Sequence, residues 1–392
     1  MATLQEVAKI IEKKYKTGQV LVAGDMIPKV NLLSMGTLSF DYAVSGGLPY
    51  GSIVEFSGQF GSGKSTAAAL AMAQYQKQNP DRVCIWVDVE DSFRLQLPFF
   101  QKMTGLKTDS NHLMVYDCTG KSAENILDDI LHLQIEVDNI GMIVIDSTAS
   151  LVSSDDLEND FTKDNGQRSA TAKTSNKFCK QIRGHLKTKG NILLTINQTV
   201  VEGKTFTGAN IYNELGGKAW KFHADIRIRF STRTFVKDGK NDVAMTKAEG
   251  ATGFVLKFSL TKSRIGAPNR GGGFITFDYE KGLETIADTV EVAILGGYIL
   301  RPNNSTYLIT DLDTGEVLLD DNGDELKFIG KAKLVAYLTD NDEFREEYFN
   351  KLNDYISGQA GTLSLLDKEA LKEIAEMENG VEDKKTEDKE KE

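Results

Sequence analysis

Short apolar segments and amphipathic segments alternate through the middle of the chain. Three segments hold β-branched and other apolar residues with little polar interruption, as strands buried on both faces do: Val83–Glu90, Met142–Ser147 and Asn191–Gln198. Ala123–Val137 and Lys173–Leu186 predict helices. Buried strands separated by helices predict an α/β fold with a mostly parallel central sheet.

Segments of a different texture flank this region. Leu4–Tyr15 has the apolar spacing of a helix, so residues 1–33 are predicted to form an N-terminal helical arm that is too short for its own core. We expect this arm to pack on the main body or on another subunit. From Leu283 onward, short helices and strands predict a small α/β domain over residues 283–378. Residues 34–282 are then the core domain.

Three polar segments fit neither a helix nor a strand. Ser153–Gln167 and Thr199–Gly217 lie between predicted elements, and loops of this length are usually functional or mobile. Residues 379–392 are rich in Glu, Asp and Lys without apolar periodicity, which predicts a disordered acidic tail.

One glycine-containing stretch carries the strongest chemical signal. Ile53–Phe56 predicts a strand, Gly58–Ser65 matches the phosphate-binding pattern G-x-x-x-x-G-K-[ST], and Thr66–Gln76 is an alanine-rich helix former. Such a loop turns backbone N–H groups toward a triphosphate, and the start of the helix adds positive potential. Lys64 can reach the β- and γ-phosphates, and the Ser65 hydroxyl can bind Mg²⁺. The candidate nucleotide-binding residues are Gly58, Gln59, Phe60, Gly61, Ser62, Gly63, Lys64, Ser65 and Thr66.

Polar residues end the other predicted strands, and ligands of open α/β sheets bind beyond the carboxyl ends of strands. Asp146 is expected to hold Mg²⁺ through water. Glu90 is a candidate to orient or deprotonate the attacking water, with an exposed strand-end carboxylate as the alternative. Gln198 is a candidate sensor of the γ-phosphate that passes its presence into the next loop, with a plain strand terminator as the alternative.

Charge is distributed unevenly along the 392 residues. From Lys163 to Arg233 there are 14 lysines and arginines against 4 acids, a local charge of +10. The whole chain carries −11, so the remainder carries −21. A basic middle in an acidic chain is typical of a polyanion site, and a solvated basic face is the alternative.

Cysteines and apolar runs limit the class of protein. Cys84, Cys118 and Cys179 are far apart and odd in number, which predicts neither a disulfide framework nor a metal site and favours a reducing, cytoplasmic compartment. The four histidines are scattered and are interpreted as structural or surface residues. No long apolar run indicates a signal peptide or a membrane span.

The ordered set of segments resembles the RecA-type strand-exchange recombinases over about residues 30–356. Besides the P-loop, the resemblance rests on these segments: SMGTLSFD (34–41), GGLPYG (46–51), VDVE (87–90), IVIDS (143–147), INQ (196–198), GGKAWKF (216–222), TKSRIGAP (261–268) and IGKAKLVAYLTDNDEF (329–344). The resemblance implies a RecA-type ATPase core that uses ATP and Mg²⁺. It also implies a homo-oligomeric helical filament on single-stranded DNA that pairs with double-stranded DNA and exchanges strands.

The resemblance also assigns roles to residues. It implies that Glu90 is the hydrolytic carboxylate and Gln198 the γ-phosphate sensor. Lys262 and Arg264 match the basic pair that reaches the ATP of the neighbouring subunit, where cations would neutralise charge on the transferred phosphoryl group. The two long polar segments resemble the DNA-binding loops of the family. The candidate DNA-binding residues in these two segments, and directly after each of them, are Lys163, Arg168, Lys204, Phe206, Gly216, Gly217 and Lys218.

The chain departs from the family pattern in places that indicate a phage-encoded or otherwise distant member. Arg264 stands where bacterial members carry lysine, which keeps the charge and adds donors. The aromatic residue that stacks on adenine is either Phe99 or Phe100. Two other functions stay open: a recombination mediator or structural nucleotide-binding filament, and a ring helicase on the same core. A loader and single-strand-binding proteins are expected as further partners of a recombinase.

Overall fold

The computed structural model describes residues 31–158, 168–204, 210–231, 233–236, 250–264, 271–320 and 322–358. The chain divides into two compact units, residues 1–31 and 32–392, and every described helix and strand belongs to the second. The predicted helix Leu4–Tyr15 and the predicted acidic tail, residues 379–392, lie outside the described residues. The proposed domain boundaries therefore stay predictions.

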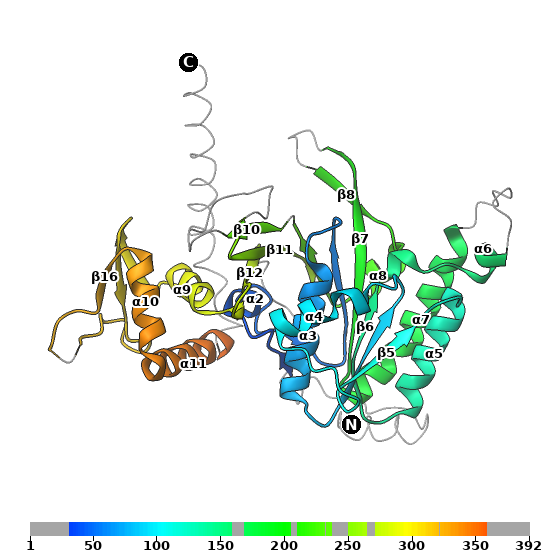
Figure 1. The fold of residues 1–392 in the computed structure, drawn as a ribbon, viewed down its shortest axis with the longest axis horizontal. Helices are drawn as coiled ribbons and strands as arrows, with labels where there is room; N and C mark the ends of the chain where they lie inside the picture. Colours follow the sequence, from blue (N-terminus) through cyan, green and yellow to red (C-terminus); the bar gives the residue numbers. More distant parts are fainter. Residues whose placement is uncertain are drawn as a thin grey trace, which may run out of the picture. The chain divides into compact units, whose positions relative to one another are not determined.

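Strands and helices of the core domain follow one another closely (Figure 1). The strands are β1 (Leu32–Leu33), β2 (Leu48–Pro49), β3 (Ile53–Gly58), β4 (Val83–Asp88), β5 (Leu113–Asp117), β6 (Ile140–Asp146), β7 (Ile192–Lys204), β8 (Asn210–Glu214), β9 (Ile226–Phe230), β10 (Thr234–Val236), β11 (Gly253–Ser263), β12 (Gly272–Asp278) and β13 (Gly282–Glu284). The helices are α2 (Leu38–Ala43), α3 (Lys64–Gln78), α4 (Phe93–Thr104), α5 (Ala123–Glu136), α6 (Ser154–Glu158), α7 (Arg168–Lys189) and α8 (Lys218–His223), with a 3-10 turn at Thr148–Ser150.

The central sheet confirms the predicted α/β fold. Its main path runs β13-β12-β11-β9-β3-β7-β6-β4-β5. The six strands from β9 to β5 are parallel, and β11, β12 and β13 extend the sheet in antiparallel fashion. Because β3 lies between β7 and β9, the loop that follows it is flanked by a parallel strand on each side.

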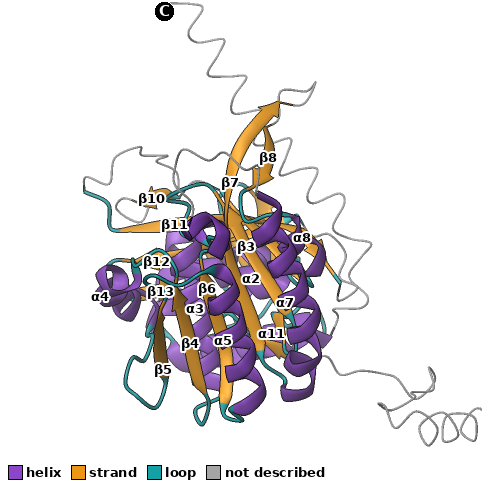
Figure 2. Cartoon of the chain, turned by 90° about the vertical axis from the view of Figure 1, so that its right-hand side faces the viewer, coloured by secondary structure: helices purple, strands orange, loops and turns teal. Residues whose placement is uncertain are grey.

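Helices cover both faces of this sheet (Figure 2). On one face α3 is buried almost all round, since its alanines allow close approach to the strands. Gly141 of β6 makes room for Tyr75 of α3, because a Cβ at residue 141 would lie 2.4 Å from the tyrosine ring. On the other face α5, α7 and α8 share a second buried cluster. The nucleotide-loop strand is therefore buried on both sides.

Three predictions of local structure were wrong. Ser153–Gln167, predicted to be neither helix nor strand, begins with the short helix α6. Thr199–Gly217 is largely a β-hairpin, because β7 continues to Lys204 and pairs antiparallel with β8. Thr199, Val200 and Val201 are β-branched and continue the strand, which projects beyond its neighbours (Figures 1 and 2). The strand predicted over Val83–Glu90 ends at Asp88, whose carboxylate accepts hydrogen bonds from the first N–H groups of α4.

The C-terminal region confirms the predicted mixture of short helices and strands. It comprises α9 (Ile286–Leu295), β14 (Ile299–Asn303), β15 (Thr306–Ile309), β16 (Lys327–Ile329), α10 (Lys331–Asp340) and α11 (Asp342–Gly358). These elements share a hydrophobic cluster that also contains Leu38 of α2. Beside it, Asp288 of α9 accepts hydrogen bonds from Thr37 Oγ1 (2.7 Å) and Ser39 N (3.1 Å) at the start of α2. A buried carboxylate thus joins the core domain to the C-terminal region.

The Asp288 carboxylate predicts a pH-dependent stability. Burial raises the pKa of Asp288 to about 7, although the hydrogen bond from Thr37 opposes the rise. The native state therefore binds more protons than the unfolded state between about pH 4 and pH 7, and the free energy of unfolding falls as pH rises through this window. At roughly 1.36 kcal/mol per pKa unit, the loss for this group is about 4 kcal/mol. We expect Asp288→Asn to reduce the change in the urea midpoint of unfolding between pH 5 and pH 8.

An exposed acid provides the control for this measurement. Asp324 is exposed, so the urea midpoint of Asp324→Asn should change with pH as steeply as that of the wild type. Burial also raises the pKa of Asp41 to about 7, so some pH dependence persists in Asp288→Asn. A slope in Asp288→Asn equal to that of the wild type would contradict the assignment.

Candidate nucleotide-binding site

The phosphate-binding loop joins β3 to α3. Gly58 closes β3, and a Cβ there would lie 2.5 Å from the carbonyl oxygen of Phe230 on β9. Gly63 precedes α3 with φ +86°, a left-handed conformation that favours glycine. Its Cβ would also meet Leu256 at 2.4 Å. The two glycines therefore allow the turn that aims the start of α3 at the cavity.

Polar groups at the start of α3 fit a triphosphate with Mg²⁺. Lys64 Nζ donates to the carbonyl oxygen of Gln59 at 2.8 Å, and burial lowers the pKa of Lys64 against the opposing effects of Asp146 and Glu90. Burial raises the pKa of Asp146 to about 7, although its hydrogen bond with Ser65 opposes the rise. A hydroxyl beside a buried carboxylate is a donor set that suits Mg²⁺, which takes few protein ligands and keeps several waters.

Glu90 and Gln198 are in direct contact. Gln198 Nε2 donates to Glu90 Oε1 at 3.0 Å, and Ser150 Oγ donates to the same oxygen at 3.0 Å. The Ser147 hydroxyl also donates to Glu90. The structure therefore joins two residues that the sequence assigned to separate strand ends. Ser147 follows Asp146 directly, so its position at the same strand end could have identified it.

A cavity of about 550 Å³ opens beside these groups, a size usual for small-ligand sites. Its lining is Phe60, Gly61, Gly63, Lys64, Ser65, Thr66, Glu90, Ser92, Gln96, Phe99, Asp146, Ser147, Ile196, Gln198 and Arg233. Gly58, Gln59 and Ser62 belong to the loop without lining this cavity. Phe99 faces the cavity, whereas Phe100 is fully buried in the core, so the structure favours Phe99 as the stacking residue.

The β7–β8 hairpin is tied to this site through Gln198 and its neighbour. Gln198 pairs with Gly58 across the β3–β7 ladder. Its carbonyl oxygen accepts a hydrogen bond from the Leu215 N–H (2.9 Å) at the end of the hairpin. The side-chain oxygen of Asn197 accepts from the Gly216 N–H at 2.9 Å. A displacement of Gln198 would therefore move the residues at the base of the hairpin.

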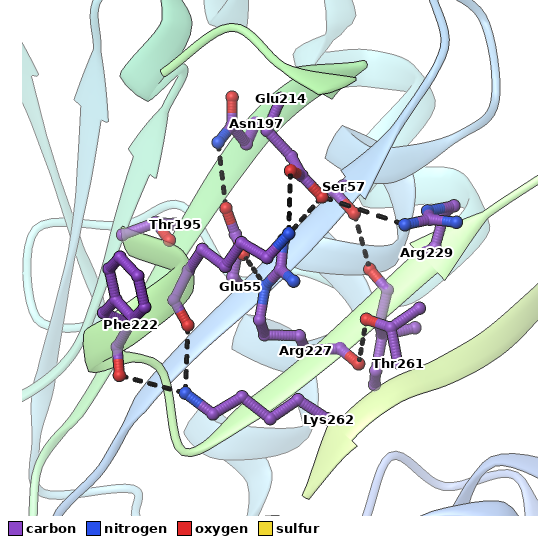
Figure 3. Close-up of polar contacts among 12 residues, drawn as sticks. Glu55, Ser57, Thr195, Asn197, Glu214, Phe222, Arg227, Arg229, Thr261 and Lys262 are labelled. Carbon is purple, nitrogen blue, oxygen red and sulfur yellow. Dashed lines mark hydrogen bonds and ion pairs between the residues drawn. The ribbon is translucent and has the colours of Figure 1, made fainter. Parts of the chain in front are cut away.

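Beneath the hairpin lies a buried ion-pair network (Figure 3). The Arg227 guanidinium of β9, only 4% exposed, binds Glu55 of β3 through Nε and Glu214 of β8 through Nη2 (2.6 Å). Asn197 Nδ2 of β7 donates to Glu55 Oε1 at 2.9 Å. Arg229 and Lys221 lie farther from Glu214, at 3.8 and 3.9 Å. This network links four strands around the nucleotide loop, and no motif in the sequence indicates it.

Lys262 and Arg264 lie away from the cavity of their own subunit. Lys262 Nζ donates to the carbonyl oxygens of Lys221 (2.9 Å) and Phe222 (3.0 Å), as Figure 3 shows. Arg264 donates to the carbonyl oxygen of Phe222 (2.9 Å) and to Asp225 (3.2 Å). In the sheet, Lys262 of β11 lies opposite Arg227 of β9. Arg227 in turn lies opposite Glu55 in the middle of β3, not opposite the end of β3 that carries the loop.

The candidate DNA-binding residues are only partly described. Lys163 and Phe206 lie outside the described residues, as does the side chain of Arg168 at the start of α7. Lys204 is exposed at the end of β7. Gly216, Gly217 and Lys218 lie between the hairpin and α8, where the Gly217 φ of +84° favours glycine. Among the described residues, no helix is long and apolar enough to cross a membrane, and no cluster of three or more His, Cys, Asp or Glu could hold a metal.

A family model described as the RecA N-terminal domain matches residues 2–282. The chain belongs to the RecA family. Its P-loop and its mostly parallel central sheet are therefore features of a RecA-type fold.

Named relatives cover most of this RecA-family chain. The mitochondrial DNA repair protein recA homolog 3 of Arabidopsis thaliana is 27% identical over 90% of this chain and 74% of its own. Protein RecA of Arthrospira platensis is 26% identical over 91% of this chain and 88% of its own. The crystal structure of the RadB recombinase gives a TM-score of 0.43 at 18% identity, over 65% of this chain and 99% of that one.

The ion-pair network predicts a specific loss of stability. Arg227→Met removes the nearest cation from two buried carboxylates, so we expect the free energy of unfolding to fall by about 3–5 kcal/mol in urea denaturation. Adding Glu55→Gln should recover part of this loss, because one buried charge is then removed. Arg229→Met is the matched control: its side chain is 29% exposed and 3.8 Å from Glu214, and we expect a cost below about 1 kcal/mol. Equal costs for the two arginines would contradict the network.

Proposed function

We propose that this chain is an ATP-dependent DNA recombinase that forms helical filaments on single-stranded DNA and catalyses pairing and strand exchange in recombination and repair. The observation that carries the proposal is the position of Gln198. Its side chain meets Glu90 at the nucleotide cavity, and its carbonyl oxygen holds the end of the β7–β8 hairpin. Family membership and the relatives named for RecA and for DNA repair support the proposal.

Five polar side chains of the cavity have roles in the proposed ATP hydrolysis. The loop N–H groups and Lys64 bind the phosphates. Ser65 and Asp146 would hold Mg²⁺, which neutralises charge between the phosphates when bound. Glu90 orients and deprotonates the attacking water, and three hydrogen bonds fix its carboxylate. When ATP binds, Gln198 would exchange its bond to Glu90 for one to the γ-phosphate, which would shift the base of the hairpin and leave the two serines to hold Glu90.

The DNA-binding role rests on the hairpin and on charge. Lys204 and the apolar side chains of Val200 and Val201 are exposed along β7. The region from residue 163 to residue 233 carries a net charge of +10, which suits a phosphate backbone. Binding through backbone charge and base stacking is tolerant of sequence, as a homology search requires.

A neighbouring subunit completes the site in this proposal. Lys262 and Arg264 are held together at the surface by the end of α8 and lie away from their own nucleotide cavity. Supplied by the next subunit, they would neutralise charge on the transferred phosphoryl group, so hydrolysis would depend on the filament.

The first test measures ATP turnover with and without single-stranded DNA across a range of salt concentrations. We expect DNA to stimulate turnover. We expect Glu90→Gln to lower turnover at least about 100-fold while ATP binding and DNA-bound filaments persist, since a positioned base contributes that much. Asp91→Asn is the control, because Asp91 is the adjacent acid, does not line the cavity, and has a φ of +51° that asparagine tolerates.

Three outcomes decide among the candidate functions. Turnover indifferent to DNA would contradict the proposal. Filaments that bind DNA but fail to exchange strands alone would favour a mediator. Closed hexamers in negative-stain images would favour a ring helicase.

The second test concerns the basic pair and uses mixed subunits. Lys64→Ala lacks the P-loop cation, whereas a chain with Lys262→Ala and Arg264→Ala keeps it. Each alone should lose turnover at least about 1,000-fold. In an equal mixture, roughly a quarter of the head-to-tail interfaces join an intact loop to an intact basic pair. Turnover should therefore return to roughly a quarter of the wild-type rate. Absence of recovery would show that the pair acts within its own subunit.

A further inference from the structure

One cation of the nucleotide cavity has no role in the proposed reaction. Arg233 follows β9 and lines the cavity together with Phe99 and Gln96 of α4. No ion pair to Arg233 occurs among the residues that the structure describes. Its guanidinium carbon instead lies 5.1 Å from the centroid of the Phe254 ring and 5.3 Å from that of Phe235.

These contacts place Arg233 among aromatic side chains beside the cavity. Phe99, which lines the cavity, also stacks with Phe254, with ring centroids 6.0 Å apart and planes at 24°. Lys64, Asp146, Glu90 and Gln198 form the polar part of the lining. Because the polar part suits the phosphates, an aromatic part of the same cavity suits a nucleobase.

A guanidinium in this position can bind a base by its flat face. It meets aromatic rings on one side and the cavity on another. Guanidinium groups stack on π-systems, and every base presents a π-face. A lysine ammonium lacks the planar surface for this contact.

We propose that Arg233 binds the nucleobase of the nucleotide, stacking on it beside Phe99, and that it does not bind the phosphates. The proposal rests on the proposed function, since it presumes that the cavity takes ATP. It assigns nucleotide affinity to a residue outside the P-loop. It also predicts tolerance among bases, because stacking reads no hydrogen-bond pattern.

The test compares a ligand that has a base with one that lacks it. Calorimetry would measure the binding of ADP and of inorganic tripolyphosphate, each with Mg²⁺, to the full-length protein. We expect Arg233→Ala to raise the Kd of ADP about 5-fold to 30-fold, the usual range for a stacked cation. The Kd of tripolyphosphate should change by less than about twofold, since tripolyphosphate has no base to stack on. Weakened binding of both ligands would assign Arg233 to the phosphates and overturn the proposal.

Two further variants sharpen the result. Arg233→Lys keeps the charge without the planar group, so its Kd for ADP should be closer to that of Arg233→Ala than to that of the wild type. Arg301→Ala is the matched control, because Arg301 lies 5.7 Å from the Tyr307 ring in the C-terminal sheet, away from the cavity. It should bind ADP as the wild type does. An Arg233→Lys variant with wild-type affinity would overturn the stacking assignment.

The outcome separates this inference from the proposed function. Wild-type protein that binds ADP without DNA-stimulated turnover of ATP would contradict the recombinase proposal and leave the Arg233 comparison valid. Normal turnover with unchanged ADP binding in Arg233→Ala would contradict the Arg233 proposal alone. Wild-type protein that binds neither ligand would contradict both.

Discussion

The nucleotide site depends on one buried guanidinium. Arg227 holds Glu55 of the nucleotide-loop strand and Glu214 of the hairpin at once, and all three side chains are almost completely buried. Removing charges from water costs several kcal/mol per ion, so such a network contributes little net stability. The network supplies position instead, because two buried carboxylates would lose their nearest cation if this geometry were lost. The arrangement of β3, β7, β8 and β9 around the loop is therefore strongly specified.

That fixed arrangement gives a γ-phosphate a short route to the hairpin. Gly58 and Gln198 are paired, the Gln198 side chain meets Glu90, and its carbonyl oxygen holds Leu215. Asn197 binds Glu55 with one side-chain atom and Gly216 with the other. Adjacent residues of one strand thus couple the hairpin to the cavity and to the buried network. In the proposed function, the Gln198 side chain moves with the nucleotide while Asn197 stays fixed.

Local patterns could be predicted from the sequence, and long-range pairings could not. The loop residues, Asp146, Glu90 and Gln198 follow from motif spacing and from the rule that ligands meet strand ends. Arg227 and Glu55 are 172 residues apart, and no local pattern around either residue predicts their contact. The alternation in Ile226–Phe230 predicts a half-exposed strand, yet the hairpin covers its polar face. Phe99 and Phe100 are adjacent aromatics, and only the packing of α4 shows which of them faces the cavity.

The charges of the cavity explain why a single subunit would be a poor enzyme. Asp146 and Glu90 lie beside Lys64, so the phosphate end carries more negative than positive charge before a triphosphate arrives. Arg233 instead contacts aromatic rings, and in the proposal above it binds the base rather than the phosphates. In the proposed function, Mg²⁺ would offset part of this excess, and a neighbouring subunit would supply further cations. Lys262 and Arg264 are presented as a pair by the end of α8, where a neighbour's cavity could receive them. Because positive charge is lacking beside the phosphates, hydrolysis would then require that subunits assemble.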